Sequence, residues 1–102
     1  MNSGLPNLST TEGLILELLS DGDLFGLELV QRAGGKLKRG TVYVTLGRMQ
    51  EKGYVTSRTE PLPPNAIGLP RRRYHPTAFG LRVLDASTVA ARAFADRLLL
   101  ET

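Results

Sequence analysis

Residues 40–55 read GTVYVTLGRMQEKGYV, and within them a helical pattern passes directly into a strand pattern. Val42, Leu46 and Met49 recur at i, i+4 and i+7, which is the spacing of one buried helix face. Gly53 stops the pattern, because glycine accepts the left-handed backbone at a helix end. We therefore expect a helix over residues 40–52, followed by a strand over residues 54–59, where aromatic and β-branched residues are frequent.

A second face of the 40–52 helix remains free for a ligand. Thr41, Thr45 and Arg48 repeat the same spacing on it, and Val44 borders it. Tyr43 lies close to this face and fits two roles, a core aromatic or a ligand contact. Glycine in mid-helix costs about 1 kcal/mol relative to alanine. Gly47 is therefore either a tolerated surface position or a place where a ligand approaches the helix backbone closely.

Two helices are predicted before this one. The pattern Ser9-x-x-Glu12 is typical of a capping box, and the leucines and isoleucine that follow it lie at helical spacing. The run Ser20-Asp21-Gly22-Asp23 predicts a turn that ends the first helix. A second helix is expected over residues 26–33, closed by Gly34 and Gly35. Residues 1–8 are expected to form a loose lead-in.

A returning strand and a long helix are predicted after it. Residues 60–70 read EPLPPNAIGLP, and their four prolines predict a long loop whose role we leave open. Residues 71–75 return as the second strand, on which Arg71 and Arg73 share one face and Arg72 the other. Pro76 has no N–H and should end the pairing. Thr77 is a plausible N-cap for a last helix through residue 100.

The last helix is too long for so small a domain to cover. Its 24 residues span about 36 Å. The excess apolar face predicts dimerisation with a second copy of the chain, although a helix folded over its own core is the alternative. The expected dimerisation residues are Leu81, Leu84, Ala91, Phe94, Ala95 and Leu98.

Charge is segregated along the 102 residues. Residues 1–31 carry five acidic and no basic side chains (−5), residues 32–73 carry ten basic and two acidic ones (+8), and residues 74–102 carry three of each (0). The sum, −5 + 8 + 0, gives the net charge of +3. A segregated basic segment is typical of a protein that binds a polyanion. The alternative is a solvated face whose bases pair with acids elsewhere.

Three short helices, a two-stranded ribbon and a long helix form the order of a winged helix-turn-helix, a mainly α (α+β) fold. In that arrangement the third helix enters the major groove of DNA and the ribbon touches the backbone or the minor groove. The basic segment covers the same elements. We expect a DNA-binding unit over residues 1–76 and a dimerisation helix over residues 77–102, within one compact domain. The expected DNA contacts are Lys36, Lys38, Arg39, Thr41, Tyr43, Val44, Thr45, Arg48, Arg58, Arg71, Arg72 and Arg73.

Four segments in this order resemble the PadR family of transcriptional regulators. Residues 40–55 resemble the family's third helix, and residues 71–80 (RRRYHPTAFG) its second wing strand and the following helix start. Residues 12–19 (EGLILELL) and 25–29 (FGLEL) resemble its first two helices. The resemblance implies a homodimer that binds a palindromic operator, usually as a repressor. Some members bind small aromatic or cationic ligands at the dimer interface, but nothing in this sequence indicates an effector.

Other function classes find little support in the composition. The chain has no cysteine and one histidine, so neither a thiolate nor a multi-histidine metal site is expected, and no cofactor is expected. His75 has no nucleophile motif beside it, so we expect it to be a surface residue or a phosphate neighbour, and we do not expect an enzyme.

No apolar run is long enough to span a membrane, and the first residues of the sequence do not resemble a signal peptide, which favours the cytoplasm. The remaining alternative is a winged helix that binds proteins without sequence-specific DNA binding.

Overall fold

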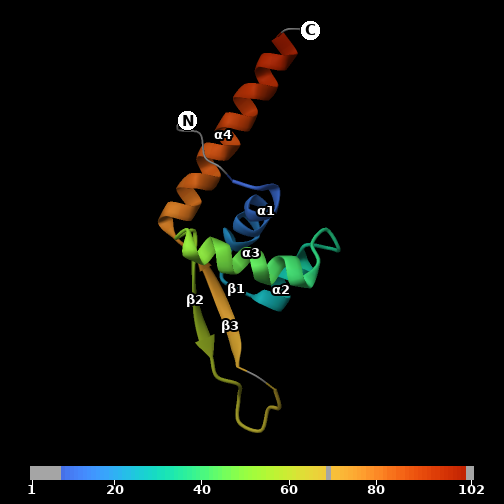
Figure 1. Ribbon diagram of the computed structural model, residues 1–102, viewed down its shortest axis with the longest axis vertical. Helices are drawn as coiled ribbons and strands as arrows, with labels where there is room; N and C mark the ends of the chain where they lie inside the picture. Colours follow the sequence, from blue (N-terminus) through green and yellow to red (C-terminus); the bar gives the residue numbers. More distant parts are fainter. Residues whose placement is uncertain (1–7, 69, 101–102) are drawn as a thin grey trace.

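The computed structural model describes residues 8–68 and 70–100 and shows a winged helix with a projecting last helix (Figure 1). Most of the expected lead-in lies outside the described residues. In chain order, the elements are α1 (Thr10–Leu19), β1 (Leu24–Phe25), α2 (Gly26–Arg32), α3 (Arg39–Glu51), β2 (Val55–Glu60), β3 (Arg71–Pro76) and α4 (Ala78–Leu100). All four helices and both wing strands were predicted.

The core lies among α1, α2, α3 and the base of the sheet. Val42, Leu46 and Met49 are fully buried, which confirms the predicted inner face of α3. They pack with buried residues of α1 and α2, such as Ile15 and Leu29. The predicted capping box of α1 is also present. The Ser9 hydroxyl accepts a hydrogen bond from the Glu12 N–H (3.1 Å), and the Glu12 carboxylate accepts one from the Ser9 N–H (2.9 Å).

The sheet has three antiparallel strands in the order β1-β3-β2, where the sequence predicted two. The additional strand, β1, pairs Leu24 with Tyr74 and Phe25 with Arg73. A strand of two residues is too short to show an alternating pattern, so periodicity could not reveal it. Its pairing joins the wing to the helices, and Tyr74 is buried at this junction.

The prediction that Pro76 ends the pairing was wrong, because β3 includes it opposite Val55. Hydrogen-bonded and non-hydrogen-bonded pairs alternate in an antiparallel ladder. The next pair is hydrogen-bonded, since the Thr77 N–H donates to the Tyr54 carbonyl (2.9 Å). Pro76 therefore occupies a non-hydrogen-bonded position, where its missing N–H costs the β2–β3 ladder nothing. Glu60, which was expected in the loop, is the last residue of β2.

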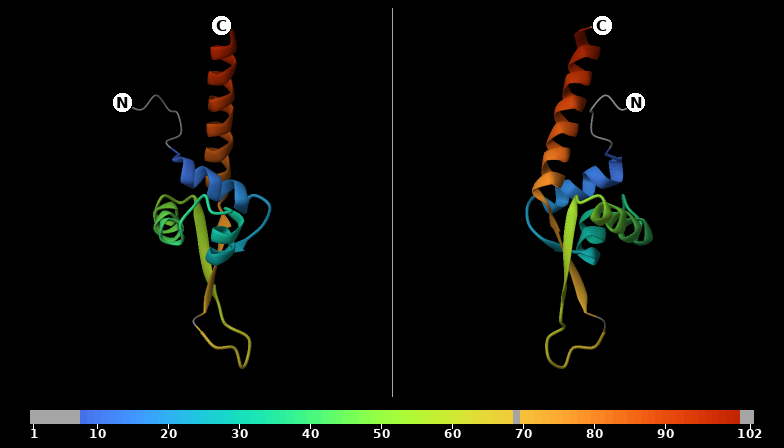
Figure 2. Two further views of the ribbon diagram at one scale, coloured as in Figure 1. Left: turned by 90° about the vertical axis from the view of Figure 1, so that its right-hand side faces the viewer. Right: turned by 60° about the vertical axis from the view of Figure 1, so that its left-hand side comes forward.

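The junction between the wing and α4 is held by Thr77, as its predicted capping role requires. Its hydroxyl accepts a hydrogen bond from the Gly80 N–H (2.9 Å) and donates to the carbonyls of Gly53 (2.6 Å) and Tyr54 (3.1 Å). From this point α4 leaves the body of the molecule (Figure 2), and all its side chains from residue 91 to 100 are exposed. The protein is consequently elongated, at 62 × 26 × 22 Å.

Candidate nucleic-acid interface

The outer ridge of α3 consists of Gly40, Val44 and Gly47 and faces away from the core. Val44 is 57 % exposed. No other part of the protein lies within 4 Å of the position that a Cβ would take at Gly40 or Gly47. Because two of its three residues have no side chain, a ligand that binds along this ridge could approach the backbone of α3 closely. Open space at Gly47 agrees with both interpretations of this glycine.

One flank of the ridge faces the start of α1. Thr41, Thr45 and Arg48 line a cleft of about 320 Å³ together with Ser9, Thr11, Glu12 and Lys52. Their common cleft confirms the predicted second face of the helix. Among the described residues, Arg48 has no ion-pair partner, so its guanidinium is available to a ligand. The neighbouring Lys52 is occupied, because its ammonium lies 2.7 Å from a Glu12 carboxylate oxygen.

Glu12 is the buried acid of this cleft, with only 4 % of its surface exposed. Burial raises the pKa of its carboxyl, but the hydrogen bonds from Lys52 and from Ser9 outweigh burial and hold the pKa below the usual range. The same contact with Glu12 raises the pKa of Lys52. The pair thus ties the end of α3 to the start of α1 and sets one wall of the cleft.

The other flank of the ridge faces the wing. Arg39 and Tyr43 of α3 lie across a cleft of about 420 Å³ from Arg71 and Arg72 of β3. Tyr43 is 41 % exposed, yet its ring packs on the first residue of α2. A Cβ at Gly26 would lie 2.5 Å from a ring carbon of Tyr43. Tyr43 is therefore a packed aromatic whose ring is partly exposed in the cleft, and its role as a ligand contact stays a prediction.

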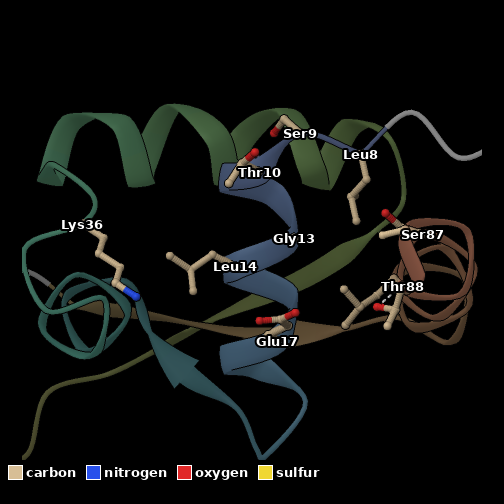
Figure 3. A pocket seen from close by; sticks show the side chains of 11 residues that line it. Leu8, Ser9, Thr10, Gly13, Leu14, Glu17, Lys36, Ser87 and Thr88 are labelled. Atoms are coloured by element: carbon tan, nitrogen blue, oxygen red, sulfur yellow. Dashed lines mark hydrogen bonds between the residues drawn. The ribbon is translucent and has the colours of Figure 1, made fainter. Parts of the chain in front are cut away.

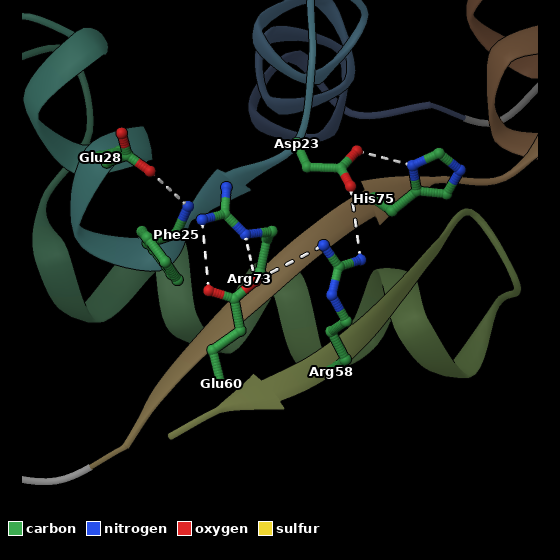
Figure 4. Close-up of polar contacts among 7 residues, drawn as sticks. All are labelled: Asp23, Phe25, Glu28, Arg58, Glu60, Arg73 and His75. Carbon is green, nitrogen blue, oxygen red and sulfur yellow. Dashed lines mark hydrogen bonds and ion pairs between the residues drawn. The ribbon is translucent and has the colours of Figure 1, made fainter. Parts of the chain in front are cut away.

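An ionic network at the base of the wing occupies two of the four predicted wing arginines (Figure 4). The Arg73 guanidinium donates two hydrogen bonds to Glu60 (2.6 and 3.3 Å) and stacks over the Phe25 ring at 4.0 Å. The Arg58 guanidinium lies 3.5 Å from both Asp23 and Glu60. The hydrogen bond from Arg73 lowers the pKa of Glu60. These two arginines are engaged within the protein.

Asp23 links this network to the turn before β1. His75 Nδ1 lies 2.6 Å from the Asp23 carboxylate, and this hydrogen bond is the largest cause of the lowered pKa of Asp23. The alternative interpretation of the charge pattern therefore holds for part of the basic segment, where Arg58, Arg73 and Lys52 pair with acids. His75 is exposed, as expected.

The other two wing arginines have no ion-pair partner within residues 8–68 and 70–100. Arg71 also lies over the Phe25 ring, at 4.2 Å from its centroid, and Arg72 donates to the Ser57 hydroxyl at 3.0 Å. The contact of Arg71 and Arg73 with one ring, while Arg72 reaches Ser57, confirms the predicted alternation along the strand. Arg71 and Arg72 are the wing arginines left for a ligand.

The basic residues before α3 are divided between two surfaces. Lys38 is the N-cap residue of α3 and its side chain makes no capping hydrogen bond, so the first N–H groups of the helix have no side-chain cap. Arg39 follows in the wing-side cleft. Lys36, in contrast, points across α1 and lines a groove between α1 and α4 with Leu14 and Glu17 (Figure 3). The structure does not bring Lys36 together with the other predicted contacts.

The groove between α1 and α4 measures about 540 Å³, and the predicted dimerisation residues lie in or beyond it. Leu84 and Ala91 line it, and Leu84 also packs on the core. Ala95 is exposed. The exposed fractions of Leu81, Phe94 and Leu98 are 38 %, 64 % and 50 %. The apolar face of α4 is therefore uncovered within one chain, as the sequence predicted.

Sequence reasoning missed the residues that hold this surface in shape. Gln50 accepts a hydrogen bond from the Ser57 hydroxyl (2.9 Å) and so fixes β2 against α3. Asp23 and Glu60 neutralise wing arginines. The role of Glu60 could have been predicted by aligning the two wing strands, because it lies opposite Arg71 in their register. Asp23 lies in a turn far away in the sequence, so no local sequence pattern indicates its contact with Arg58. Among the described residues there is no cluster that could hold a metal ion and no helix able to cross a membrane.

Comparisons with known proteins agree with this architecture. The PadR-like family of transcriptional regulators matches residues 15–86, whereas a comparison with curated proteins gives no match. A PadR family transcription regulator from Clostridium difficile is 25 % identical, with a TM-score of 0.74 over 91 % of this chain and 97 % of that one. A PadR-like regulator from Bacillus cereus is 26 % identical, with a TM-score of 0.67 over 86 % and 89 %.

A third structure, Bacillus subtilis PadR in complex with operator DNA, is similar in fold. It has a TM-score of 0.68 at 23 % identity, and the match covers 74 % of this chain and 45 % of that one. The family match extends from the second half of α1 through the first turns of α4 and so includes most of the winged helix. The chain described here belongs to the PadR-like family of transcriptional regulators.

Proposed function

We propose that this protein is a sequence-specific DNA-binding repressor that acts in the cytoplasm as a homodimer on a palindromic operator. The observation that carries the proposal is the exposed side of α3, where a low ridge separates two clefts. Arg48 lies in one cleft, and Arg39, Arg71 and Arg72 lie in the other, all without an acidic partner among the described residues.

The ridge fits the major groove, which is about 12 Å wide and admits an α-helix. Val44 presents an apolar side chain that matches the methyl group of thymine, and Arg48 has the length and the donors to bind a guanine edge. Thr41 and Thr45 supply short hydroxyls to phosphates or bases. Because Gly40 and Gly47 leave the ridge low, these side chains would reach the base edges without a steric barrier.

Phosphates would be held on the two sides of α3. Lys38 and Arg39 surround the uncapped N-terminus of the helix, which favours an anion through its free N–H groups and its dipole. Arg71 and Arg72 would meet further phosphates from the wing. Such contacts position the protein without reading sequence, and each released counterion makes binding weaker at high salt.

A second copy would cover the exposed apolar face of α4. Two α4 helices and the adjoining α1 grooves would bury side chains such as Phe94 and Leu98 from both chains. In such a dimer the two α3 helices would be related by a two-fold axis, so the DNA sequence that they recognise would be a palindrome. A dimer bound there would block the access of other proteins to that DNA.

The proposal is tested by selecting duplexes from a random-sequence library with the purified protein and by measuring its mass in solution by light scattering. We expect a single palindromic sequence to be enriched and the mass of a dimer to be found. A monomer that binds selected and random duplexes equally well would overturn the proposal and favour a protein-binding winged helix.

A further inference from the structure

The wing loop, residues 61–70, has a composition unlike the rest of the wing. It contains four prolines, two leucines and an isoleucine, and it has no charged residue. Figure 1 shows its described residues 61–68 at the end of the molecule opposite α4, beyond the last paired residues of β2 and β3. Directly after the turn of this loop, Ile67 is 100 % exposed. An isoleucine this exposed contributes little to the folded core, and its side chain is free to contact a ligand.

The loop has a defined shape. The Ala66 N–H donates to the Pro63 carbonyl (3.1 Å), with Pro64 and Asn65 between them. Proline at the first central position and a φ of 70° at Asn65 identify a type II turn. Leu62 folds back toward Gly68, where a Cβ would lie 3.9 Å from its Cδ1 atom. The turn and the prolines restrict the backbone of the loop, which lowers the ordering cost when Ile67 meets a ligand.

We propose that the wing loop is an apolar wedge that enters the minor groove and places Ile67 between two adjacent base pairs. This inference rests on the proposed DNA-binding function. Inserted isoleucine, leucine or proline side chains partly unstack a base step and bend the duplex toward the major groove. Asn65, at the adjoining turn, supplies an amide donor for the minor-groove acceptors of A·T pairs.

Charge complementarity points to DNA as the occupant. The uncharged loop stands at the end of a stem that carries arginine on both strands, and Arg71 and Arg72 lie at its base without acidic partners among the described residues. The acid nearest to the loop, Glu60, is bound by Arg73. Phosphates on the two sides of a minor groove would meet the stem while the apolar tip meets the bases between them.

The test uses duplexes recovered from the random library, labelled with 2-aminopurine at successive steps and with a fluorescence energy-transfer pair at their ends. The full chain is compared with Ile67→Ser, which removes the apolar wedge, and with Ile67→Leu, which keeps it. Ile67 is fully exposed, so neither change should alter the stability of the fold. We expect the wild type and Ile67→Leu to raise 2-aminopurine fluorescence at one step in each half-site and to shorten the end-to-end distance.

Ile67→Ser should bind the same sequence about tenfold more weakly, as the loss of one buried aliphatic contact implies, and should give neither signal. Unchanged fluorescence and bending by Ile67→Ser would overturn the wedge while leaving the proposed DNA binding intact. Ile67-dependent binding to phosphatidylcholine–phosphatidylserine vesicles, without unstacking of DNA, would also overturn it. If the protein selects no duplex at all, the proposed DNA-binding function is overturned, and the wedge proposal that rests on it is overturned as well.

Discussion

Arg48 is the side chain whose surroundings most clearly suit the recognition of a base. It lies beside the outer ridge of α3, and Lys52, the other base among the described residues that line its cleft, is bound to Glu12. We expect Arg48→Ala to weaken binding to the selected operator by about 1–3 kcal/mol and to relax the preference at one base position. Binding curves on the operator and on its single-base variants would measure both effects.

The matched control for Arg48 is Arg82→Ala, which removes an exposed arginine from the first turns of α4. This variant should keep the base preference of the wild type. If both variants lost the same affinity on every sequence, Arg48 would be a phosphate contact or a general charge, and its assignment to a base would be wrong.

Glu12 makes the stability of the fold depend on pH in a defined direction. The pKa of its carboxyl is lowered by folding, so the ionised form stabilises the native state above the usual value of 4.5, and this contribution is lost as the pH falls through the lower native value. Glu12→Gln should lower the free energy of unfolding by about 1–3 kcal/mol at pH 7, because Lys52 loses its charged partner.

The difference between Glu12→Gln and the wild type should shrink as the pH is lowered below 4.5, and urea unfolding at several pH values would follow it. Glu17→Gln is the matched control, since Glu17 is on the same helix and exposed. It should leave stability nearly unchanged at every pH. A Glu12→Gln effect of constant size down to acidic pH would show that charge is not its cause.

At the scale of the elements, two helical glycines have opposite surroundings. A Cβ at Gly80 would overlap the backbone carbonyl of Tyr54, where the start of α4 meets the sheet. Because the obstacle is backbone, Gly80→Ala should destabilise the fold by about 3 kcal/mol or more. A Cβ at Gly47 meets open space, so Gly47→Ala should stabilise α3 by up to about 1 kcal/mol. Thermal unfolding of the two variants would measure this contrast.

Gly47→Ala also separates the two interpretations that the sequence left open. If DNA approaches the backbone of α3 closely, this more stable variant should bind the operator several-fold more weakly than the wild type. Unchanged affinity would identify Gly47 as a tolerated surface position.

The elements differ in how much of them the sequence could reveal. The inner face of α3, the capping box of α1 and the Thr77 cap of α4 were predictable, because each depends on residues within one or two helical turns. The strand β1 was not predictable, because a strand of two residues is too short to show the alternation of buried and exposed side chains. The pairing of Arg58 with Asp23 joins residues 35 positions apart, so it depends on the strand register and on a distant turn. The basic segment therefore overstated the positive charge that is left free on α3 and the wing.

For the whole molecule, the proposed dimerisation through the exposed face of α4 can be tested with a single charge. Leu98→Glu places a charge on the apolar face that a second copy would bury, and it should convert the dimer to a monomer in sedimentation experiments. Operator affinity should fall by at least about tenfold, since one half-site is then bound alone. Ala86→Glu, at an exposed position on the opposite side of the helix, is the control and should remain dimeric. A dimeric Leu98→Glu would exclude this face of α4 as the interface.

The single-residue joint between β3 and α4 has a consequence for how two protomers would measure DNA. Thr77 clamps the end of β3, the start of α4 and the turn after α3 to one another through a single hydroxyl. In a pair held by α4, the distance between the two α3 helices then depends on the angle at which each α4 leaves its winged helix. Thr77 fixes that angle. Thr77→Val would loosen that setting, so the protein should begin to accept operators whose halves are spaced one base pair closer or farther apart.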